Sequence, residues 1–205
     1  MTLPGTDVEQ DAAEAQLGER AIRTRDSIVD AARTLFLTKG YAGTRIADIT
    51  DACNISRAGF YTYFKDKLEV FYLLGRTAYR ENLAIFSAWE EMSRPCTRAD
   101  VDSWVLRYFA FLDLHGAFVL SANTTPDSDE VRADSTRMTV RCCFLLGVGL
   151  RARQNVPTET PEALGMAFKS LLDRTWHQLR VEPLPMEDDE VRGAVIDILL
   201  ATLDN

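Results

Sequence analysis

Apolar residues recur along most of the chain at intervals of three and four, the spacing of an amphipathic α-helix. The stretch TRDSIVDAARTLFLTKGY, which begins at Thr24, places five of them at i, i+3, i+4, i+7 and i+8: Ile28, Ala31, Ala32, Leu35 and Phe36. Thr24 can cap the start of such a helix, and Gly40 is a typical C-terminal stop. The pattern therefore predicts a helix over about residues 24–39.

Two short helices joined by a tight turn are predicted next. The first begins at Thr44, whose hydroxyl can cap it, and ends before Asn54, a residue that tolerates a left-handed backbone. Ser56 follows the turn closely and can cap the second short helix. Helices joined so tightly must cross at a steep angle, which is the helix-turn-helix geometry.

The rest of the chain also shows a helical pattern. Asp66 and Glu69 have the spacing of a capping box, which predicts a long helix over about residues 66–92. Five further helices are predicted between turn-rich stretches, at about 98–114, 116–123, 128–154, 160–180 and 188–203. The sequence shows neither a strong period-2 run nor an Asn-Gly turn to predict a strand. The expected fold class is all-α.

Charge is distributed unevenly along the 205 residues, whose net charge is -8. Residues 1–19 hold five acids and no Lys or Arg, whereas residues 20–67 hold nine cations and five acids. Residues 1–20 also lack a sustained apolar period, so we expect them to form a flexible arm. The basic segment after them can attract phosphates even though the whole protein is acidic.

Several classes of function are disfavoured by the residues present. The four cysteines have no CxxC spacing, and the two histidines, His115 and His177, accompany no nucleophile motif, phosphate loop or metal-ligand spacing. We therefore expect no enzyme activity, metal site or cofactor. No apolar run approaches the roughly 20 residues that span a bilayer, and the N-terminus lacks a signal-peptide pattern. We expect a cytoplasmic protein with no membrane partner.

Aromatic and basic residues are crowded into FYTYFKDK, which begins at Phe60. Phe60 and Phe64 lie four residues apart, so they share one face of the third predicted helix, and we expect both to point into the core. Tyr61 and Tyr63 then point elsewhere, and a tyrosine hydroxyl can donate a hydrogen bond to a phosphate oxygen. The segment therefore combines core residues with candidate contacts to nucleic acid.

Cations flank these aromatic residues. Arg57 would project from the first turn of the third helix, where recognition helices touch base edges, and a guanidinium can bind two acceptors of guanine. Lys65 and Lys67 lie at the start of the fourth helix, whose free N–H groups and positive dipole end also favour a phosphate.

Residues 24–75 resemble the DNA-binding domain of the TetR family of transcriptional repressors. The matching elements are IVDAARTLFLTKGYAGT, RIADITDACNIS and RAGFYTYFKDKLEVF, in the same order with short gaps. FYTYFKDK is the most specific of them, because a generic helix-turn-helix has no reason to carry it. The resemblance implies a TetR-like architecture. A three-helix homeodomain-like domain over residues 21–67 would precede a helical ligand-binding and dimerisation domain over residues 68–205.

The resemblance also implies roles for individual residues. It gives Thr44 and Tyr61 phosphate contacts, and it makes Arg45 a candidate base contact like Arg57. Tyr63 and Lys67 match positions that usually touch the DNA backbone. Gly59 departs from the family, which often has Ser or Thr there, and with Ala58 it could let the backbone approach the groove. The candidate DNA-binding residues are Thr44, Arg45, Ser56, Arg57, Ala58, Gly59, Tyr61, Tyr63, Lys65 and Lys67.

Two apolar stripes mark the last two predicted helices. Such stripes more often face the chain's own core, but the resemblance implies that they form half of a four-helix dimer interface. The candidate interface residues are Phe168, Leu171, Leu172, Thr175, Leu179, Val191, Val195, Ile198 and Leu199.

Bulky residues between these regions have core packing as their ordinary role. Several carry a polar group, as a pocket for an apolar ligand requires, and the resemblance implies an effector cavity there. The candidate ligand-binding residues are Trp89, Trp104, Tyr108, Phe111, Phe118, Met138, Cys142 and Trp176. Gly147 and Gly149 are costly in a helix, which indicates a close helix crossing or a bend.

The resulting functional hypothesis is a repressor that binds a palindromic operator in double-stranded DNA as a homodimer. A small apolar effector would release it by favouring a dimer whose recognition helices no longer match successive major grooves. The alternative is a helical module that binds a small molecule or a protein and has no DNA function.

Overall fold

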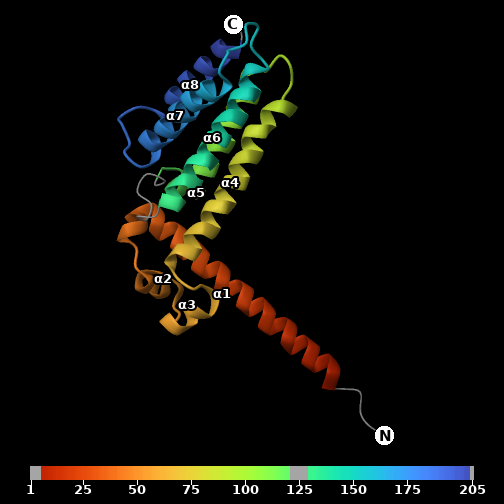
Figure 1. Cartoon of the computed structure of the whole chain (residues 1–205), viewed down its shortest axis with the longest axis vertical. Coiled ribbons are helices and arrows are strands. Elements are labelled where there is room, and N and C mark those ends of the chain that lie inside the picture. The colour runs from red at the N-terminus through yellow and green to blue at the C-terminus, as the bar shows by residue number, and fades with distance from the viewer. Residues whose placement is uncertain (1–5, 121–128, 204–205) are drawn as a thin grey trace. The chain divides into compact units, whose positions relative to one another are not determined.

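The computed structural model describes residues 6–120 and 129–203, which form eight α-helices and contain no strand (Figure 1). The all-α fold class is therefore confirmed. None of the described helices is long and apolar enough to cross a membrane. The helices are α1 (Thr6–Gly43), α2 (Ile46–Cys53), α3 (Arg57–Tyr63), α4 (Lys67–Glu91), α5 (Arg98–Leu120), α6 (Asp129–Arg151), α7 (Pro161–Arg180) and α8 (Asp188–Leu203).

The chain forms two compact units, one ending at Leu74 and the other starting at Gly75. α4 is continuous through this boundary, which lies several residues after the expected one at residues 67 and 68. The first turns of α4 belong to the first unit because the Phe71 ring packs 5.7 Å from Phe36 and 4.9 Å from Tyr41.

α1 is longer than the apolar pattern predicts. It begins at Thr6, inside the stretch that we expected to be a flexible arm. Residues 6–20 are rich in Ala, Glu and Gln, which favour helix even without an apolar stripe. Near its other end the helix is interrupted at Gly40, whose φ of 71° and ψ of 166° are non-helical, so the stop lies at the predicted residue.

The turn between α2 and α3 has the predicted conformation. Asn54 adopts the left-handed region with φ 53° and ψ 47°, and the Ser56 hydroxyl oxygen accepts a hydrogen bond from the Gly59 N–H at 3.0 Å. Phe60 and Phe64 are buried, as predicted. The start of α2 is different, because its N-cap is Arg45 rather than Thr44. The Arg45 N–H donates to the Asp48 carboxylate at 2.7 Å.

In the second unit, α5, α6, α7 and α8 pack against one another (Figure 1). α5 is one helix where the pattern predicted two, with a break between residues 114 and 116. Gly116 does not end the helix. It gives room to Trp176 of α7, because a Cβ at Gly116 would lie 2.5 Å from the Trp176 ring.

α6 and α7 cross with almost no space between their backbones. A Cβ at Gly147 would overlap the Pro161 carbonyl oxygen, and a Cβ at Gly165 would overlap that of Cys143. Gly149 faces α4 in the same way, because its Cβ would lie 2.7 Å from Trp89 Cβ. The close crossing that Gly147 and Gly149 indicated is confirmed.

Candidate nucleic-acid interface

α3 has one buried side and one exposed side. Phe60 holds the helix to the core of the first unit, and Arg57, Ala58, Tyr61 and Thr62 are exposed. The Tyr61 ring packs edge-on against Phe60, with centroids 5.6 Å apart, yet remains 52% exposed. A rigid, half-exposed tyrosine beside an exposed arginine is suited to contacting a phosphate and a base edge.

Three of the predicted cations are available on the surface of this unit. Arg45, Arg57 and Lys65 are exposed, and none of them forms an ion pair with a described residue. Arg45 lies at the N-terminus of α2 and Arg57 at the N-terminus of α3. Exposed guanidinium groups that form no ion pair offer both a charge and N–H donors to a nucleic acid.

Thr44 is not available in this way. It is 1% exposed, and its hydroxyl lies 2.8 Å from the Gly40 carbonyl oxygen, to which it can donate. The structure therefore does not support a phosphate contact of the Thr44 side chain. Its hydroxyl instead satisfies a carbonyl at the interruption of α1.

The half-buried Lys67 side chain is also bound to other groups of the protein. Its ammonium donates to the carbonyl oxygens of Tyr41 and Thr44, both at 2.6 Å, and lies 4.1 Å from the centroid of the Tyr41 ring. Burial lowers the pKa of Lys67, and the charge of Asp48 opposes this shift. Lys67 therefore joins the start of α4 to the α1–α2 turn, and the structure does not support the predicted phosphate contact.

The remaining candidates differ in exposure. Ser56 is exposed, but its hydroxyl oxygen is the cap of α3, while Tyr63 and Gly59 are half-buried. A Cβ at Gly59 would lie 3.4 Å from Ser56 Oγ and 3.7 Å from Ile55 Cβ, so it would face the preceding turn. Thr62 is a residue that the sequence analysis missed. It follows Ala58 by one helical turn, and this spacing could have identified it as part of the exposed face.

Comparisons with known proteins agree with this geometry. The family model described as bacterial regulatory proteins, tetR family, matches residues 28–72, which contain α2, α3 and the turn between them. Residues 28–72 therefore carry a helix-turn-helix of the TetR family of transcriptional regulators. The family match covers the helix-turn-helix and the start of α4, and it does not reach α5 to α8.

Two similar proteins are named as transcriptional regulators and not as enzymes. The negative regulator IcaR of the icaADBC biofilm operon in Staphylococcus epidermidis is 43% identical over 47 residues, which are 23% of this chain and 25% of IcaR. This match thus spans only a quarter of IcaR. The repressor DhaR of Mycobacterium sp. strain GP1 is 26% identical over 199 residues, covering 88% of this chain and 94% of DhaR.

The fold of the whole chain also resembles that of solved TetR-family structures. PfmR of Thermus thermophilus superimposes with a TM-score of 0.66 at 24% identity, over 87% of this chain and 99% of PfmR. The second unit therefore shares the fold of this solved structure, although the family model does not match it.

The candidate ligand-binding residues of the second unit are mostly packed together. Trp89 lies 5.0 Å from Trp104, which stacks on Tyr108 at 5.9 Å, and Tyr108 lies 5.7 Å from Phe111. All four side chains are at most 5% exposed. The Tyr108 hydroxyl donates to the Asp173 carboxylate at 2.6 Å. These residues form an aromatic stack in the core, with a hydrogen-bonded polar group at one edge.

Three more candidates are also buried. Trp176 donates from its indole N–H to the Asp113 carboxylate at 2.7 Å, Phe118 is 9% exposed, and burial raises the pKa of Cys142 to about 12. Met138 is different, because it is half-buried and lines an open surface pocket of about 640 Å³. Tyr79, Val140 and Phe144 lie along the same pocket.

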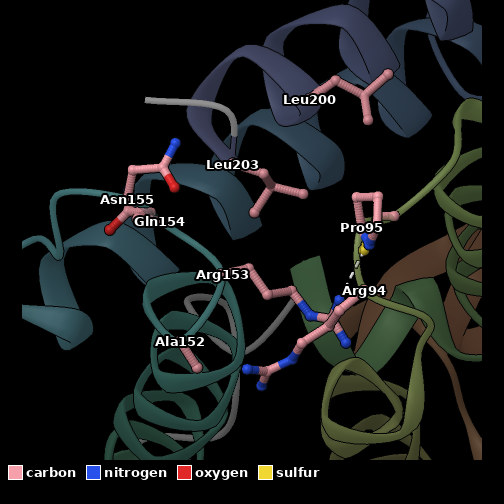
Figure 2. Close-up of a pocket in the computed structure, with 9 residues that line it drawn as sticks. Arg94, Pro95, Ala152, Arg153, Gln154, Asn155, Leu200 and Leu203 are labelled. Carbon is pink, nitrogen blue, oxygen red and sulfur yellow. Dashed lines mark hydrogen bonds between the residues drawn. The ribbon is translucent and has the colours of Figure 1, made fainter.

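A second pocket, of about 320 Å³, lies where the α4–α5 and α6–α7 connections meet the end of α8 (Figure 2). Figure 2 shows Leu200 and Leu203 on one side and the side chains of Arg94 and Arg153 on the other. The Arg153 guanidinium donates to the carbonyl oxygens of Met92 at 2.6 Å and Ser93 at 2.7 Å. Arg153 therefore caps the end of α4 and is not free to bind a ligand.

The candidate dimer residues divide into two groups. Four of them, Phe168, Leu172, Val195 and Leu199, are buried within the single chain. The other five keep exposed surface: Leu171, Thr175, Leu179, Val191 and Ile198. Ile198 is the most exposed of the nine, at 47%. The two stripes therefore serve the core of the chain, and their outer edges remain available to a partner.

Proposed function

We propose that this TetR-family protein is a repressor that binds a palindromic operator as a homodimer and is released by a small ligand. The observation that carries the proposal is the exposed side of α3, where Arg57 and Tyr61 project from a helix anchored by Phe60. Arg57 would read a base edge, and Tyr61 and Lys65 would bind phosphates. Since its target is genomic DNA, we infer that the protein acts in the cytoplasm.

We infer dimerisation from the small number of base pairs that one helix-turn-helix can contact. A single helix-turn-helix contacts only a few base pairs, so two copies are needed to span two half-sites. The half-exposed residues Leu171, Thr175 and Val191, together with the exposed Ile198, support an interface between the α7–α8 pairs of two chains. An isologous arrangement of this kind gives a two-fold axis, which matches a palindromic operator.

Release by a ligand requires that effector and DNA favour different states of the dimer. The open pocket along Tyr79, Met138 and Phe144 supports an apolar effector. Tyr79 lies on α4, which continues into the first unit, so α4 is the element through which a change at this pocket would reach the helix-turn-helix.

Selection of bound fragments from randomised DNA by the purified protein tests the proposal. We expect a palindrome whose half-sites lie about one helical turn, or a multiple of it, apart. A dimer that neutralises about three to five phosphates per protomer should give a log–log salt slope of roughly -5 to -9. Recovery of no enriched sequence would favour the alternative, a helical module without DNA function.

The role of Arg57 is tested on the selected site. Arg57→Ala should relax the preference at one base pair of each half-site, at a cost of about 1–3 kcal/mol. The control Lys65→Ala should weaken binding to all DNA sequences alike, because a phosphate contact carries no sequence information. An unchanged ratio between operator and scrambled duplex in Arg57→Ala would show that Arg57 does not read bases.

A further inference from the structure

The nine cations between residues 20 and 67 are not equally free to bind DNA. Three of them are paired with carboxylates: Arg23 with Glu19 at 3.0 Å, Arg33 with Asp30 at 2.7 Å and Lys39 with Asp48 at 3.3 Å. Lys67 is bound to carbonyl oxygens. The five that form no ion pair with any described side chain are Arg20, Arg25, Arg45, Arg57 and Lys65.

Arg25 stands out among these five because the structure holds its guanidinium in place. The guanidinium carbon lies 5.3 Å from the centroid of the Phe64 ring, although Arg25 itself is exposed. Phe64 is the C-cap of α3, is 2% exposed, and directly precedes Lys65. Arg25 of α1 is thereby brought to the C-terminal end of the helix that carries Arg57 and Tyr61.

This arrangement suits a phosphate contact. A guanidinium over a ring uses its face for the aromatic contact and leaves its N–H edges free for a bidentate anion. The side chain has also lost part of its rotamer freedom before DNA arrives, so less entropy is lost on binding. No acid is placed one turn away on α1 to compete for it, since positions 21, 22, 28 and 29 are Ala, Ile, Ile and Val.

We propose that Arg25, positioned by the Phe64 ring, is a further phosphate-binding residue of the DNA interface. The inference rests on the proposed function, because it adds a contact to the same surface. It also assigns Phe64 a second task. Besides filling the core, its ring holds a cation that comes from a different helix.

The test compares two arginines two positions apart on α1. Arg25→Met keeps an apolar chain over Phe64 but removes the charge, and Arg23→Met is the matched control because Arg23 is exposed and paired with Glu19. Each variant of the full chain is titrated onto a labelled DNA duplex of fixed, non-palindromic sequence at several salt concentrations. Binding of this probe reports phosphate contacts whatever the operator is.

We expect Arg25→Met to reduce the magnitude of the log–log salt slope by about 0.9 per bound protomer. Arg23→Met should leave the slope unchanged, and Arg25→Lys should restore most of it. The thermal midpoint of Arg25→Met should stay close to that of the wild type, which separates a DNA contact from a purely structural role.

Two results would overturn the inference while the proposed function stands. One is that Arg25→Met has the same salt slope as the wild type. The other is that Arg23→Met reduces the magnitude of the slope as much as Arg25→Met does. A wild-type protein that binds the duplex without salt dependence would instead overturn the proposed function, and the inference with it.

Discussion

Glycines of the first unit have space around them, whereas four glycines of the second unit have another helix pressed against them. A Cβ at Gly40 would meet no atom within 4 Å, and one at Gly59 would make ordinary contacts. In the second unit, a Cβ would collide with a tryptophan side chain at Gly116 and Gly149 and with a backbone carbonyl at Gly147 and Gly165. Each unit is therefore stabilised internally in a different way.

The first unit depends on polar groups placed at turns and helix ends. Ser56 caps α3, Asp48 accepts from the N-cap of α2, and Lys67 binds two carbonyl oxygens at the α1–α2 turn. Each of these interactions joins residues at a helix terminus, where backbone groups lack helical partners. The second unit depends instead on how closely α6 approaches α7 and α4, which only glycine permits at the crossings.

The largest effect that tests this contrast is expected at the α6–α7 crossing. Gly147→Ala and Gly165→Ala each place a methyl group on a backbone carbonyl of the facing helix, which cannot move aside as a side chain can. We expect each to lower the free energy of unfolding by about 3 kcal/mol or more. Urea denaturation followed by circular dichroism measures the loss.

Gly75→Ala is the matched control, because Gly75 is also helical but a Cβ there would meet no atom within 4 Å. Alanine should raise stability at this position by up to about 1 kcal/mol through its higher helix propensity. Equal effects of Gly75→Ala and Gly147→Ala would mean that the crossing is not the constraint that the structure describes.

The same contrast explains what could be predicted from the sequence. The Asn54 turn, the Ser56 cap and the inward Phe60 were predictable because each depends on residues a few positions away. Gly147 could be recognised as unusual, but its partner Gly165 could not, since their meeting depends on how two helices pack. The helix break predicted between residues 114 and 116 was wrong for the same reason. In isolation, a glycine at a helix crossing looks like a stop signal.

In the candidate interface, the errors came from side chains whose partners are backbone carbonyls. The family resemblance implied DNA contacts for Thr44 and Lys67, and their residue types are compatible with that role. In this chain both satisfy carbonyl oxygens around the end of α1, which the sequence does not reveal. Arg25 was overlooked for the opposite reason. Its link to Phe64 joins two helices that are distant in the sequence.

The next largest effect concerns Lys67. Lys67→Met removes the cation that binds the carbonyl oxygens of Tyr41 and Thr44, and it leaves both acceptors without this donor. We expect the free energy of unfolding to fall by about 1.5–3 kcal/mol. The salt slope of DNA binding should stay at the wild-type value, because this ammonium is already bound to carbonyl oxygens of the protein. Urea denaturation and duplex titration on the same samples check both parts.

Lys65→Met provides the reverse pattern two residues earlier in the chain. Lys65 is exposed and its side chain forms no ion pair with a described residue, so stability should change by less than about 0.5 kcal/mol. In Lys65→Met the magnitude of the log–log salt slope should decrease by about 0.9 per protomer. If the salt slope became smaller in magnitude in Lys67→Met and stayed unchanged in Lys65→Met, Lys67 and not Lys65 would be the phosphate-binding lysine.

The smallest effect is expected at Gly59, where the first unit has room for a side chain. Gly59→Ala should raise the free energy of unfolding by about 0.5–1 kcal/mol, because alanine favours helix and its Cβ would only touch Ser56 and Ile55. Since this Cβ faces the preceding turn, DNA affinity should change by no more than about twofold. A loss of tenfold or more in duplex titration would show that the α3 backbone itself approaches the groove at Gly59. The glycine would then be required by the DNA and not by the fold, which is the reverse of its role at the α6–α7 crossing.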